Sequence, residues 1–226
     1  MTHAALLAHV RQVLDDESKP YLWSDAELIG YYNDVMAEIA QQTDSFIDPA
    51  TTAVVDIAIS AAAVTAGTME YALSSLILEI HSAKIEDETV FLTKTTAQRM
   101  NDRIPAWRDA TAATPQYYLL DYLTGYITLY PPPVAAGTIN LTVTKLPAVI
   151  TTAALTGSPE LNSIYHQKLR HGIAKYAFLK SGEETYNEKK AAIHTILFKG
   201  LINEIKLAFL RMQRRRKVAS PHPGNI

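Results

Sequence analysis

The segment that begins at Ser24 constrains the fold most, because it carries a complete helix-start signal. Ser24 and Glu27 stand three residues apart, as in a capping box, where each side chain accepts a hydrogen bond from a free backbone amide of the first turn. Apolar residues then recur every three or four positions from Leu28 to Ile39. The spacing predicts an amphipathic helix that ends near Gln42 and packs one face against a core.

The segment before it is also predicted to be helical. Apolar residues recur at helical spacing from Thr2 to Leu14. The acidic run of residues 15–17 follows, and negative charge at the C-terminal end of a helix opposes the helix dipole. We therefore expect this helix to end before Asp15.

Two more helices are predicted in the last third of the chain. Ser158, Pro159 and Glu160 supply an N-cap, a first-turn proline and a first-turn acid, and an apolar stripe continues from there to Lys180. After a break at residues 181–182, a final helix is predicted from about residue 183 to 216, which would span about 50 Å at 1.5 Å per residue. Its apolar positions are Ile193, Ile196, Leu197, Leu201, Ile205, Ala208, Phe209 and Met212.

The middle of the chain has the character of β-structure. Residues 51–59 are rich in β-branched side chains, residues 68–80 resemble a second strand, and a short strand is predicted near residues 89–93. Thr95 and Thr96 could start a short helix that ends before Pro105.

A β-hairpin is the clearest β-signal. Residues 116–120 and 126–130 flank a turn that contains Gly125, which suits a left-handed backbone position. Three prolines at 131–133 should end the second strand, since proline cannot donate to a ladder. Residues 137–146 then alternate, with Ile139, Leu141 and Val143 on one face.

This order predicts an α+β fold, in which the N- and C-terminal helices form one helical bundle around a central small antiparallel β-sheet insertion. The expected parts are residues 1–47, 48–150, 151–217 and a flexible tail at 218–226. Hydrophobic residues make up 48% of the chain and charged residues 19%, which suits a packed globular core. The longest weakly polar stretch, residues 53–66, is too short to span a bilayer, so we expect a soluble protein made in the cytoplasm.

The usual motifs of enzymes and cofactor sites do not occur in the sequence. There are no cysteines, so disulfides and thiolate ligands are excluded, and the glycines form neither a phosphate-binding loop nor a nucleophile elbow. His166 and His171 lie five apart, which does not place them on one helix face as metal ligands, and His194 stands on another predicted helix. Surface or interface histidines are favoured over a metal site. We expect no catalytic, cofactor or metal site.

The acidic run of residues 15–17 could in principle hold Mg²⁺ or Ca²⁺. It lacks the glycine-bearing ligand loop of an EF-hand, so a solvated helix end is favoured. A small metal-dependent enzyme is kept as a hypothesis beside the structural and DNA-binding functions considered below.

Tyrosines crowd the predicted hairpin. Aromatic strands can stack on single-stranded nucleic acid, but such platforms carry Lys and Arg, and residues 116–143 contain neither. Cross-strand packing or a protein interface is favoured instead. The candidate residues for such a protein interface, with a neighbouring subunit or another protein, are Tyr117, Tyr118, Tyr122, Tyr126 and Tyr130.

A basic cluster lies at the end of the final predicted helix. The chain has a net charge of −2, and removing the five charges of the cluster leaves about −7 for the remainder. A helix dipole is already complemented by fewer charges than this, so a docking patch or a DNA-facing patch is favoured over a solvated helix end. The residues are Arg211, Arg214, Arg215, Arg216 and Lys217.

Short blocks in a fixed order carry a family resemblance. They are YLWSDAEL (21–28), YND (32–34) and EIA (38–40), then PAWRDAT (105–111), PQYY (115–118) and LYPPP (129–133), and last LP (146–147), PEL (159–161), YH (165–166), YAFL (176–179) and ETYN (184–187). In their order and spacing, over residues 21–197, the chain resembles the head-to-tail adaptor (connector, or head completion) proteins of tailed bacteriophages.

The resemblance implies a structural virion protein without enzymatic activity. Such proteins assemble as a homo-oligomeric ring, typically of twelve subunits, under the portal protein in the virion neck, after synthesis in the host cytoplasm. The ring extends the channel for the packaged DNA and receives the tail tube or nozzle protein, without a membrane partner. In relatives the C-terminal segment reaches the portal. Residues 206–226 correspond to it by position only, because their arginine-rich sequence is not a family motif.

The charge of the chain is compatible with a ring around DNA, and one alternative function stays open. A ring needs two different subunit faces that meet, and a channel for DNA should not attract phosphate strongly, which suits the negative charge outside the basic cluster. The alternative is a DNA-binding accessory protein that uses the basic C-terminal helix. It would bind duplex DNA in a salt-dependent manner.

Overall fold

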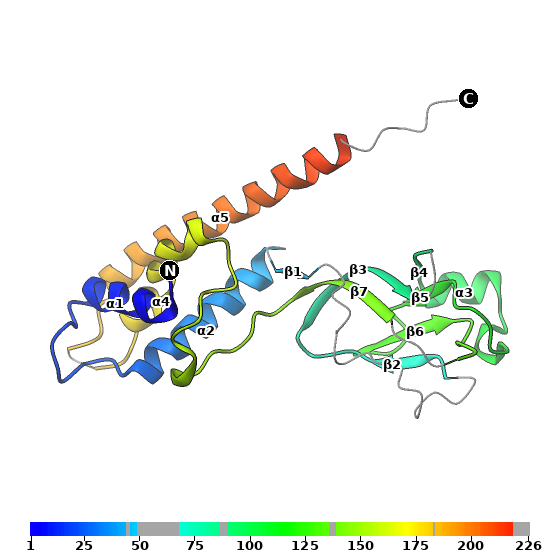
Figure 1. Cartoon of the computed structure of the whole chain (residues 1–226), viewed down its shortest axis with the longest axis horizontal. Coiled ribbons are helices and arrows are strands. Elements are labelled where there is room, and N and C mark those ends of the chain that lie inside the picture. Colours follow the sequence, from blue (N-terminus) through cyan, green and yellow to red (C-terminus); the bar gives the residue numbers. More distant parts are fainter. Residues whose placement is uncertain (44–45, 49–67, 86–89, 136–138, 183, 219–226) are drawn as a thin grey trace. The chain divides into compact units, whose positions relative to one another are not determined.

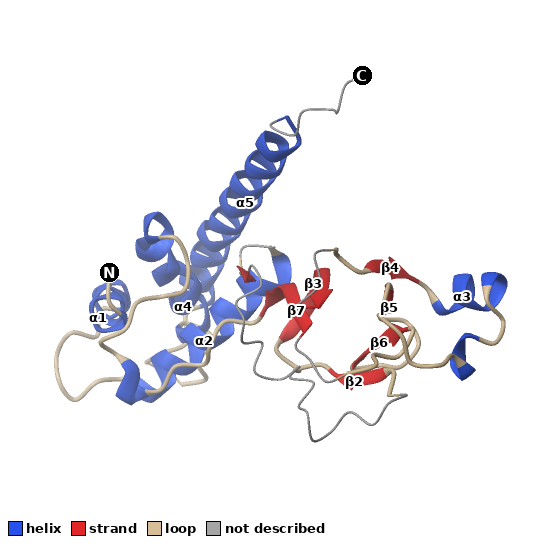
Figure 2. Cartoon of the chain, turned by 45° about the vertical axis from the view of Figure 1, so that its right-hand side comes forward, coloured by secondary structure: helices blue, strands red, loops and turns tan. Residues whose placement is uncertain are grey.

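The chain forms two compact units in a computed structural model that describes residues 1–43, 46–48, 68–85, 90–135, 139–182 and 184–218, with the side chains of residues 47–48 and 212–218 left out (Figure 1). The helical unit comprises Met1–Phe46 and Leu146–Ile226, and the β unit comprises Ile47–Lys145. All the strands formed by the described residues lie in the β unit (Figure 2). The predicted α+β class, with terminal helices around a central β-region, is confirmed.

The first two helices form as the sequence predicts. α1 (His3–Leu14) ends before the acidic run, where Asp15 adopts a left-handed backbone with φ of 58°. α2 (Asp25–Gln42) has both hydrogen bonds of the predicted capping box at Ser24 and Glu27. The Lys180 ammonium and the Ser24 donors also lower the pKa of Glu27 to about 2. Local hydrogen bonding therefore sets where α2 begins.

The prediction of one continuous helix from Ser158 to Lys180 is wrong. A short 3-10 helix (Ser163–Lys168) leads into α4 (Leu169–Ala177). Asn162 is the N-cap, and its side chain accepts a hydrogen bond from the Ile164 amide at 3.1 Å. The Glu160 carboxylate instead accepts from the Ala148 amide at 3.4 Å, in the segment that follows the β unit. A second 3-10 turn spans Thr152–Ala154.

The final helix begins later than predicted. α5 (Glu188–Val218) starts after Asn187, whose side-chain oxygen accepts from the Lys190 amide at 3.0 Å. The predicted break at residues 181–182 is confirmed, while Glu183 and the tail at 219–226 lie outside the described residues. At 31 residues and 1.5 Å per residue, α5 is about 46 Å long, close to the predicted length.

The core of the helical unit lies where α2, α4 and α5 meet. Leu28, Val35 and Ile39 of α2 are fully buried, together with Leu169 and Ile173 of α4. Phe198, Leu201, Ile202 and Ile205 of α5 close the same cluster. α1 adds Leu6 and Val10.

Gly172 sets the close approach of these helices. A Cβ atom at this position would lie 2.8 Å from the Val35 methyl groups and 2.9 Å from the Phe198 ring. We expect Gly172→Ala to lower the free energy of unfolding by about 1–3 kcal/mol, because the core is overpacked there. Urea unfolding followed by circular dichroism measures the change.

Gly30→Ala is the matched control, since nothing lies within 4 Å of the added methyl group in α2. It should stabilise the protein by about 0.5–1 kcal/mol through helix propensity. Equal stability of the two variants would contradict the close packing at Gly172.

The β unit contains two sheets rather than the single antiparallel sheet predicted. One sheet has the order β1-β7-β3, and the other has the order β2-β6-β5-β4, in which β4 runs parallel to β5. The strands are β1 (Ile47–Asp48), β2 (Glu70–Ala72), β3 (Ile77–Ile85), β4 (Thr93–Thr95), β5 (Tyr117–Leu119), β6 (Tyr126–Tyr130) and β7 (Ile139–Lys145).

Some strand predictions are confirmed and others need correction. The hairpin pairs Tyr117 with Tyr130 in antiparallel register, and Gly125 has the expected positive φ of 79°. Residues 68–80 form two strands, β2 and part of β3, because a turn closed by the Ser74 carbonyl and the Ile77 amide separates them into different sheets. The strand predicted near 89–93 begins only at Thr93, and the one predicted at 51–59 lies outside the described residues.

The core of the β unit follows the predicted alternation. Ile139, Leu141 and Val143 of β7 are buried, and Ile127 and Leu129 of β6 join them. A smaller cluster forms beside α3 (Ala97–Arg103), the predicted short helix, with Thr96 as its N-cap. It contains Met100, Trp107 and Leu119.

Candidate interaction surfaces

α5 carries two apolar faces, and the fold of the helical unit buries one of them. The buried face consists of Ala191, Phe198, Leu201, Ile202 and Ile205. Since successive residues turn by about 100° around a helix, the remaining large apolar residues fall mainly on the opposite side. They form the outer face of α5, with exposed fractions of 56% for Ile193, 71% for Ile196, 46% for Leu197, 53% for Leu207 and 50% for Leu210.

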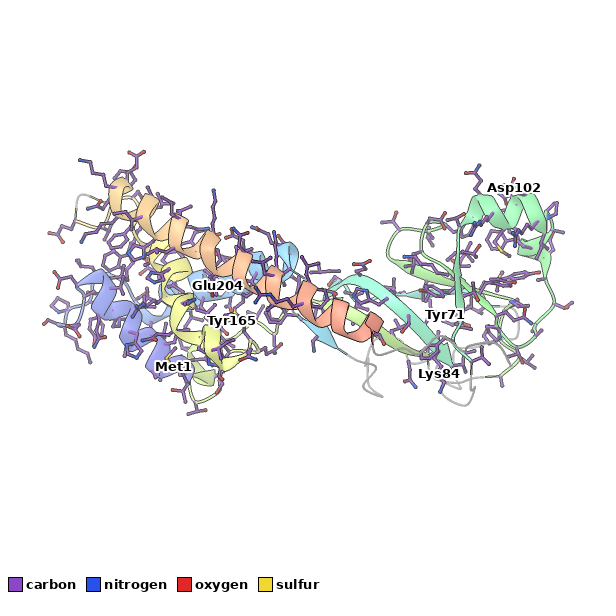
Figure 3. All side chains as sticks on the ribbon, turned by 90° about the horizontal axis from the view of Figure 1, so that it is seen from above. Met1, Tyr71, Lys84, Asp102, Tyr165 and Glu204 are labelled. Carbon is purple, nitrogen blue, oxygen red and sulfur yellow. The ribbon has the colours of Figure 1, made fainter. Side chains whose placement is uncertain are left out.

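The outer face of α5 has the chemistry of a protein contact. A helix on the surface of a monomer normally presents polar residues opposite its buried stripe, and clustered exposed apolar residues mark interaction sites. A polar rim accompanies this face, because the Lys168 ammonium donates to the Glu204 carboxylate at 2.7 Å and both side chains are exposed. Figure 3 shows Glu204 on this helix among the side chains along α5. The outer face can therefore bury apolar area against another protein.

The basic cluster lies at the far end of the same helix. Arg211 is exposed, and the helical backbone of α5 continues through residues 214–217 to Val218. The side chains of Arg214, Arg215, Arg216 and Lys217 lie outside the described part of the structure. The contact with portal or DNA assigned to this cluster stays a prediction.

The five tyrosines of the hairpin occupy different environments. Tyr118 is 1% exposed, and burial raises the pKa of its hydroxyl, so it is a core residue with no side-chain surface for a partner. Tyr117 and Tyr130 are half-buried and lie across from each other, with ring centroids 6.3 Å apart, which confirms cross-strand packing. Tyr122 and Tyr126 are each 38% exposed. An interface role stays a prediction for these two.

Tyr122 belongs to a cluster that the sequence did not reveal. Its ring packs edge-on against Trp107, with centroids 5.2 Å apart. The Arg108 guanidinium lies 4.5 Å from the Trp107 ring and 5.2 Å from the Tyr122 ring, and it donates to Asn101 Oδ1 at 3.0 Å. We call Trp107, Arg108 and Tyr122 the tryptophan cluster. Aromatic and arginine side chains of this kind are enriched at protein interfaces.

Sequence reasoning missed the tryptophan cluster because its members come from separate elements. Trp107 and Arg108 lie in a 3-10 turn (Trp107–Asp109), whereas Tyr122 lies in the hairpin turn. The only signal was the PAWRDAT block of the family resemblance, which carried no assigned role.

The histidines are less exposed than predicted. His166 is buried, and its Nε2 donates to the Leu161 carbonyl at 2.6 Å. His171 and His194, expected to be apart on different helices, meet with their Nδ1 atoms 3.0 Å apart. Within the described residues, no group of three or more His, Cys, Asp or Glu side chains is placed to hold a metal ion.

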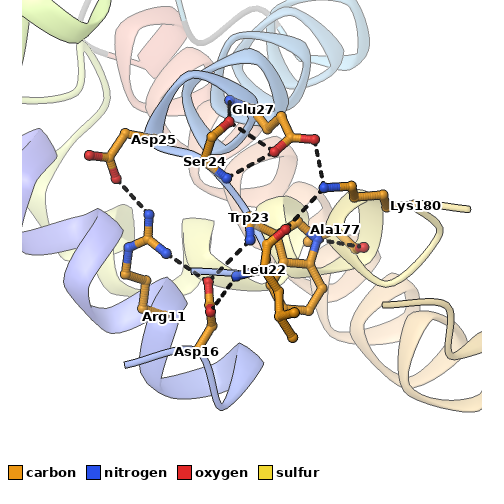
Figure 4. Close-up of polar contacts among 9 residues, drawn as sticks. All are labelled: Arg11, Asp16, Leu22, Trp23, Ser24, Asp25, Glu27, Ala177 and Lys180. Carbon is orange, nitrogen blue, oxygen red and sulfur yellow. Dashed lines mark hydrogen bonds and ion pairs between the residues drawn. The ribbon is translucent and has the colours of Figure 1, made fainter. Parts of the chain in front are cut away.

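The acidic run is not simply a solvated helix end. Asp15 and Glu17 are exposed, but Asp16 is 4% exposed and accepts from the Arg11 guanidinium at 2.7 Å (Figure 4). Its carboxylate also accepts from the Leu22 amide at 2.8 Å and the Trp23 amide at 3.3 Å. Asp16 therefore serves as a buried hydrogen-bond acceptor that orders the connection between α1 and α2.

A cavity of about 230 Å³ lies in the helical unit beside His3 and Tyr32. His3 Nε2 and the Tyr32 hydroxyl are 3.1 Å apart, and burial raises the pKa of Tyr32 and lowers that of His3. Clefts that enclose small molecules usually measure about 300–1,000 Å³. The cavity is therefore smaller than a typical substrate site.

A family model described as SU10 adaptor protein matches residues 1–224. A search of curated proteins finds no match. Across the described residues, no helix is both long and apolar enough to cross a membrane.

Proposed function

The chain belongs to the SU10 adaptor protein family, a family of phage head-to-tail adaptors, and on this basis we propose how it acts in the virion. It forms a closed ring of twelve copies in the virion neck, between the portal protein and the tail tube or nozzle. The packaged DNA passes through the lumen. Its role is structural, without a catalytic step.

The outer face of α5 is the observation that carries this proposal. Five large apolar side chains along one helix, each about half exposed or more, favour burial against another protein. In a ring every subunit uses two different faces, so one copy can cover the outer face of the next with a different part of its own surface. We assign the outer face of α5 to the contact between neighbouring copies.

The other two surfaces suit the axial partners of a ring. The basic cluster at the end of α5 can meet acidic groups of the portal protein or the backbone of the packaged DNA. The exposed residues Tyr122 and Tyr126, with the exposed Arg108 of the tryptophan cluster, can contact a tail component or a neighbouring subunit. The negative charge of the rest of the chain would keep the lumen from binding DNA tightly.

Electron microscopy of the purified chain, alone and with its portal ring, tests the proposal. We expect closed rings of twelve copies, formed either in solution or only on the portal. A chain that stays monomeric and does not bind the portal would overturn the adaptor assignment.

The DNA-binding alternative makes a separate prediction. If the basic cluster drives DNA binding, changing Arg214, Arg215 and Arg216 to Ala should reduce the salt dependence of duplex binding, with the slope of log K against log salt falling by roughly 3. Fluorescence anisotropy between low and physiological salt measures this slope. A control variant with Lys189, Lys190 and Lys199 changed to Ala removes the same charge from the same helix. Unchanged binding after the arginine substitutions would remove this alternative.

A further inference from the structure

His171 of α4 and His194 of α5 face each other at the junction of the two helices. Their Nδ1 atoms are 3.0 Å apart and their ring centroids 5.2 Å apart. The distance between the centroids equals the distance between the two nitrogens plus roughly one ring radius on each side. The two Nδ1 atoms therefore lie on the line that joins the ring centres and point at each other. This is the geometry of one N–H···N hydrogen bond, in which one ring donates and the other accepts.

We propose that this histidine pair is a proton-sensitive latch, which fastens α5 to α4 while the rings share one Nδ1 proton and opens when both rings become cationic. A first added proton can enter at the outer Nε2 of the donor ring and leaves the shared hydrogen bond in place. A second proton must occupy the accepting Nδ1, after which two donors face each other with no acceptor between them. The latch does not depend on ring formation.

The charges that act on the pair are positive. Arg170 and Lys168 act on His171, and Arg170 and Lys190 act on His194. Within the described residues, the buried Nε of Arg170 has no hydrogen-bond partner. Burial, then the facing His194 ring, then Arg170 and Lys168 lower the pKa of His171 to about 4. Burial, followed by Arg170 and Lys190, lowers the pKa of His194. The surroundings therefore keep the pair neutral near pH 7.

Among the described residues, no carboxylate is one of the charges that act on the pair. On the α2 side of α4, Glu38 already accepts from the Lys175 ammonium at 2.7 Å and the Tyr176 hydroxyl at 3.0 Å. On the α1 side, Arg11 is held by Asp16. After α4, the Phe178 ring stacks on His194 with centroids 5.6 Å apart.

The same geometry argues against a metal site. A metal ion bound by both rings would need two lone pairs that converge on one point beside the line between the nitrogens. Here the nitrogens face each other end to end across 3.0 Å, which leaves room for a proton only.

The direction of the pH dependence follows from the lowered pKa values. In the unfolded chain a histidine titrates near 6.5, so between pH 6.5 and about 4 the unfolded state binds more protons than the folded state. The stability that the neutral pair contributes is complete above pH 6.5. It is lost as the pH falls through this window.

Nitrogen-15 NMR of the full chain with labelled histidine tests the latch directly. At pH 7.5 we expect one of the two rings to carry its proton on Nδ1 and the other on Nε2, with scalar coupling across the N–H···N bond. Hydrogen exchange should show that protection of α5 around His194 falls between pH 7 and pH 5 more than protection of α1. Two rings protonated at Nε2, or both titrating near 6.5 in the folded protein, would overturn the proposal.

Substitutions distinguish the effect of the His171–His194 pair on stability from the effects of the other histidines. His171→Phe with His194→Phe should flatten most of the fall in urea midpoint between pH 7 and pH 4.5, with a residual slope from His3, whose pKa is also lowered. His9→Ala, on the surface of α1, should keep the wild-type profile. A Phe pair with the wild-type slope would contradict the latch, and so would stabilisation of the wild type by added Ni²⁺ or Zn²⁺. Should the Phe pair fail to fold, the wild-type NMR spectrum decides alone.

Discussion

Changing Ile196 and Leu207 of α5 to Asp should abolish self-association of the chain while leaving each subunit folded. In the proposed ring both positions lie against a neighbouring copy, and an unpaired charge buried at such a contact costs several kcal/mol. With two charges per contact, the association constant should fall by at least about a thousandfold, which corresponds to roughly 4 kcal/mol. Sedimentation velocity and native mass spectrometry measure the oligomer directly.

The fold of the subunit should tolerate these two changes. Ile196 is 71% exposed and Leu207 53% exposed, so each aspartate can remain hydrated in the monomer. The matched control is Ile164→Asp, which places the same charge on a residue that is 67% exposed but lies in the 3-10 helix before α4. We expect Ile164→Asp to assemble normally. Rings of unchanged size from the Ile196 and Leu207 double variant would exclude the outer face of α5 as the subunit contact.

Asp16→Ala should be the most destabilising of the single substitutions considered. The substitution removes the carboxylate that accepts from the Arg11 guanidinium and from the backbone amides of Leu22 and Trp23. The Asp16 side chain is only 2% exposed, so water cannot replace these contacts. Removing one partner of a buried ion pair leaves an uncompensated charge and typically costs about 3–5 kcal/mol. Part of that cost is offset because Arg11 keeps its second partner, Asp25, at 2.6 Å. Urea unfolding at pH 7 gives the free energy.

Glu17→Ala is the control for Asp16→Ala. It removes the same charge one residue away from an exposed position, where substitutions usually change stability by less than about 0.5 kcal/mol. The region around Trp23 should respond most to Asp16→Ala, because the Trp23 indole donates to the Ala177 carbonyl at 3.1 Å and so joins this connection to the end of α4 (Figure 4). Equal stability of the two variants would show that Asp16 does not order the connection.

Predictions from sequence succeeded where the deciding contacts lie within a few residues. The capping box at Ser24, the hairpin turn at Gly125 and the alternation of β7 all depend on neighbours in the chain, and all three are present. The prediction that a helix starts at Ser158 was wrong because the deciding contact is with a residue farther away in the chain. Glu160 bonds the Ala148 amide outside its own turn, and Asn162 provides the cap that the 3-10 helix uses.

The sheets show the same limit. Residues 68–80 have β-forming side chains throughout, but nothing in that pattern states which strand each part will pair with. In the structure β2 pairs with β6 and β3 with β7, so one predicted strand contributes to two sheets. The parallel pairing of β4 with β5 likewise depends on the path of the chain between them.

The final helix separates what the sequence determines from what the tertiary structure decides. By spacing and composition alone, residues 183–216 are a long apolar helix with a basic end, because helical periodicity is a local property. Helical spacing places Ile193, Ile196 and Leu197 on one side of this helix and Leu201 and Ile205 on the other. Only packing against α4 decides that the last two are buried while the first three form an outer face, and only that packing brings His194 to His171, since helices far apart in sequence meet through the core they share.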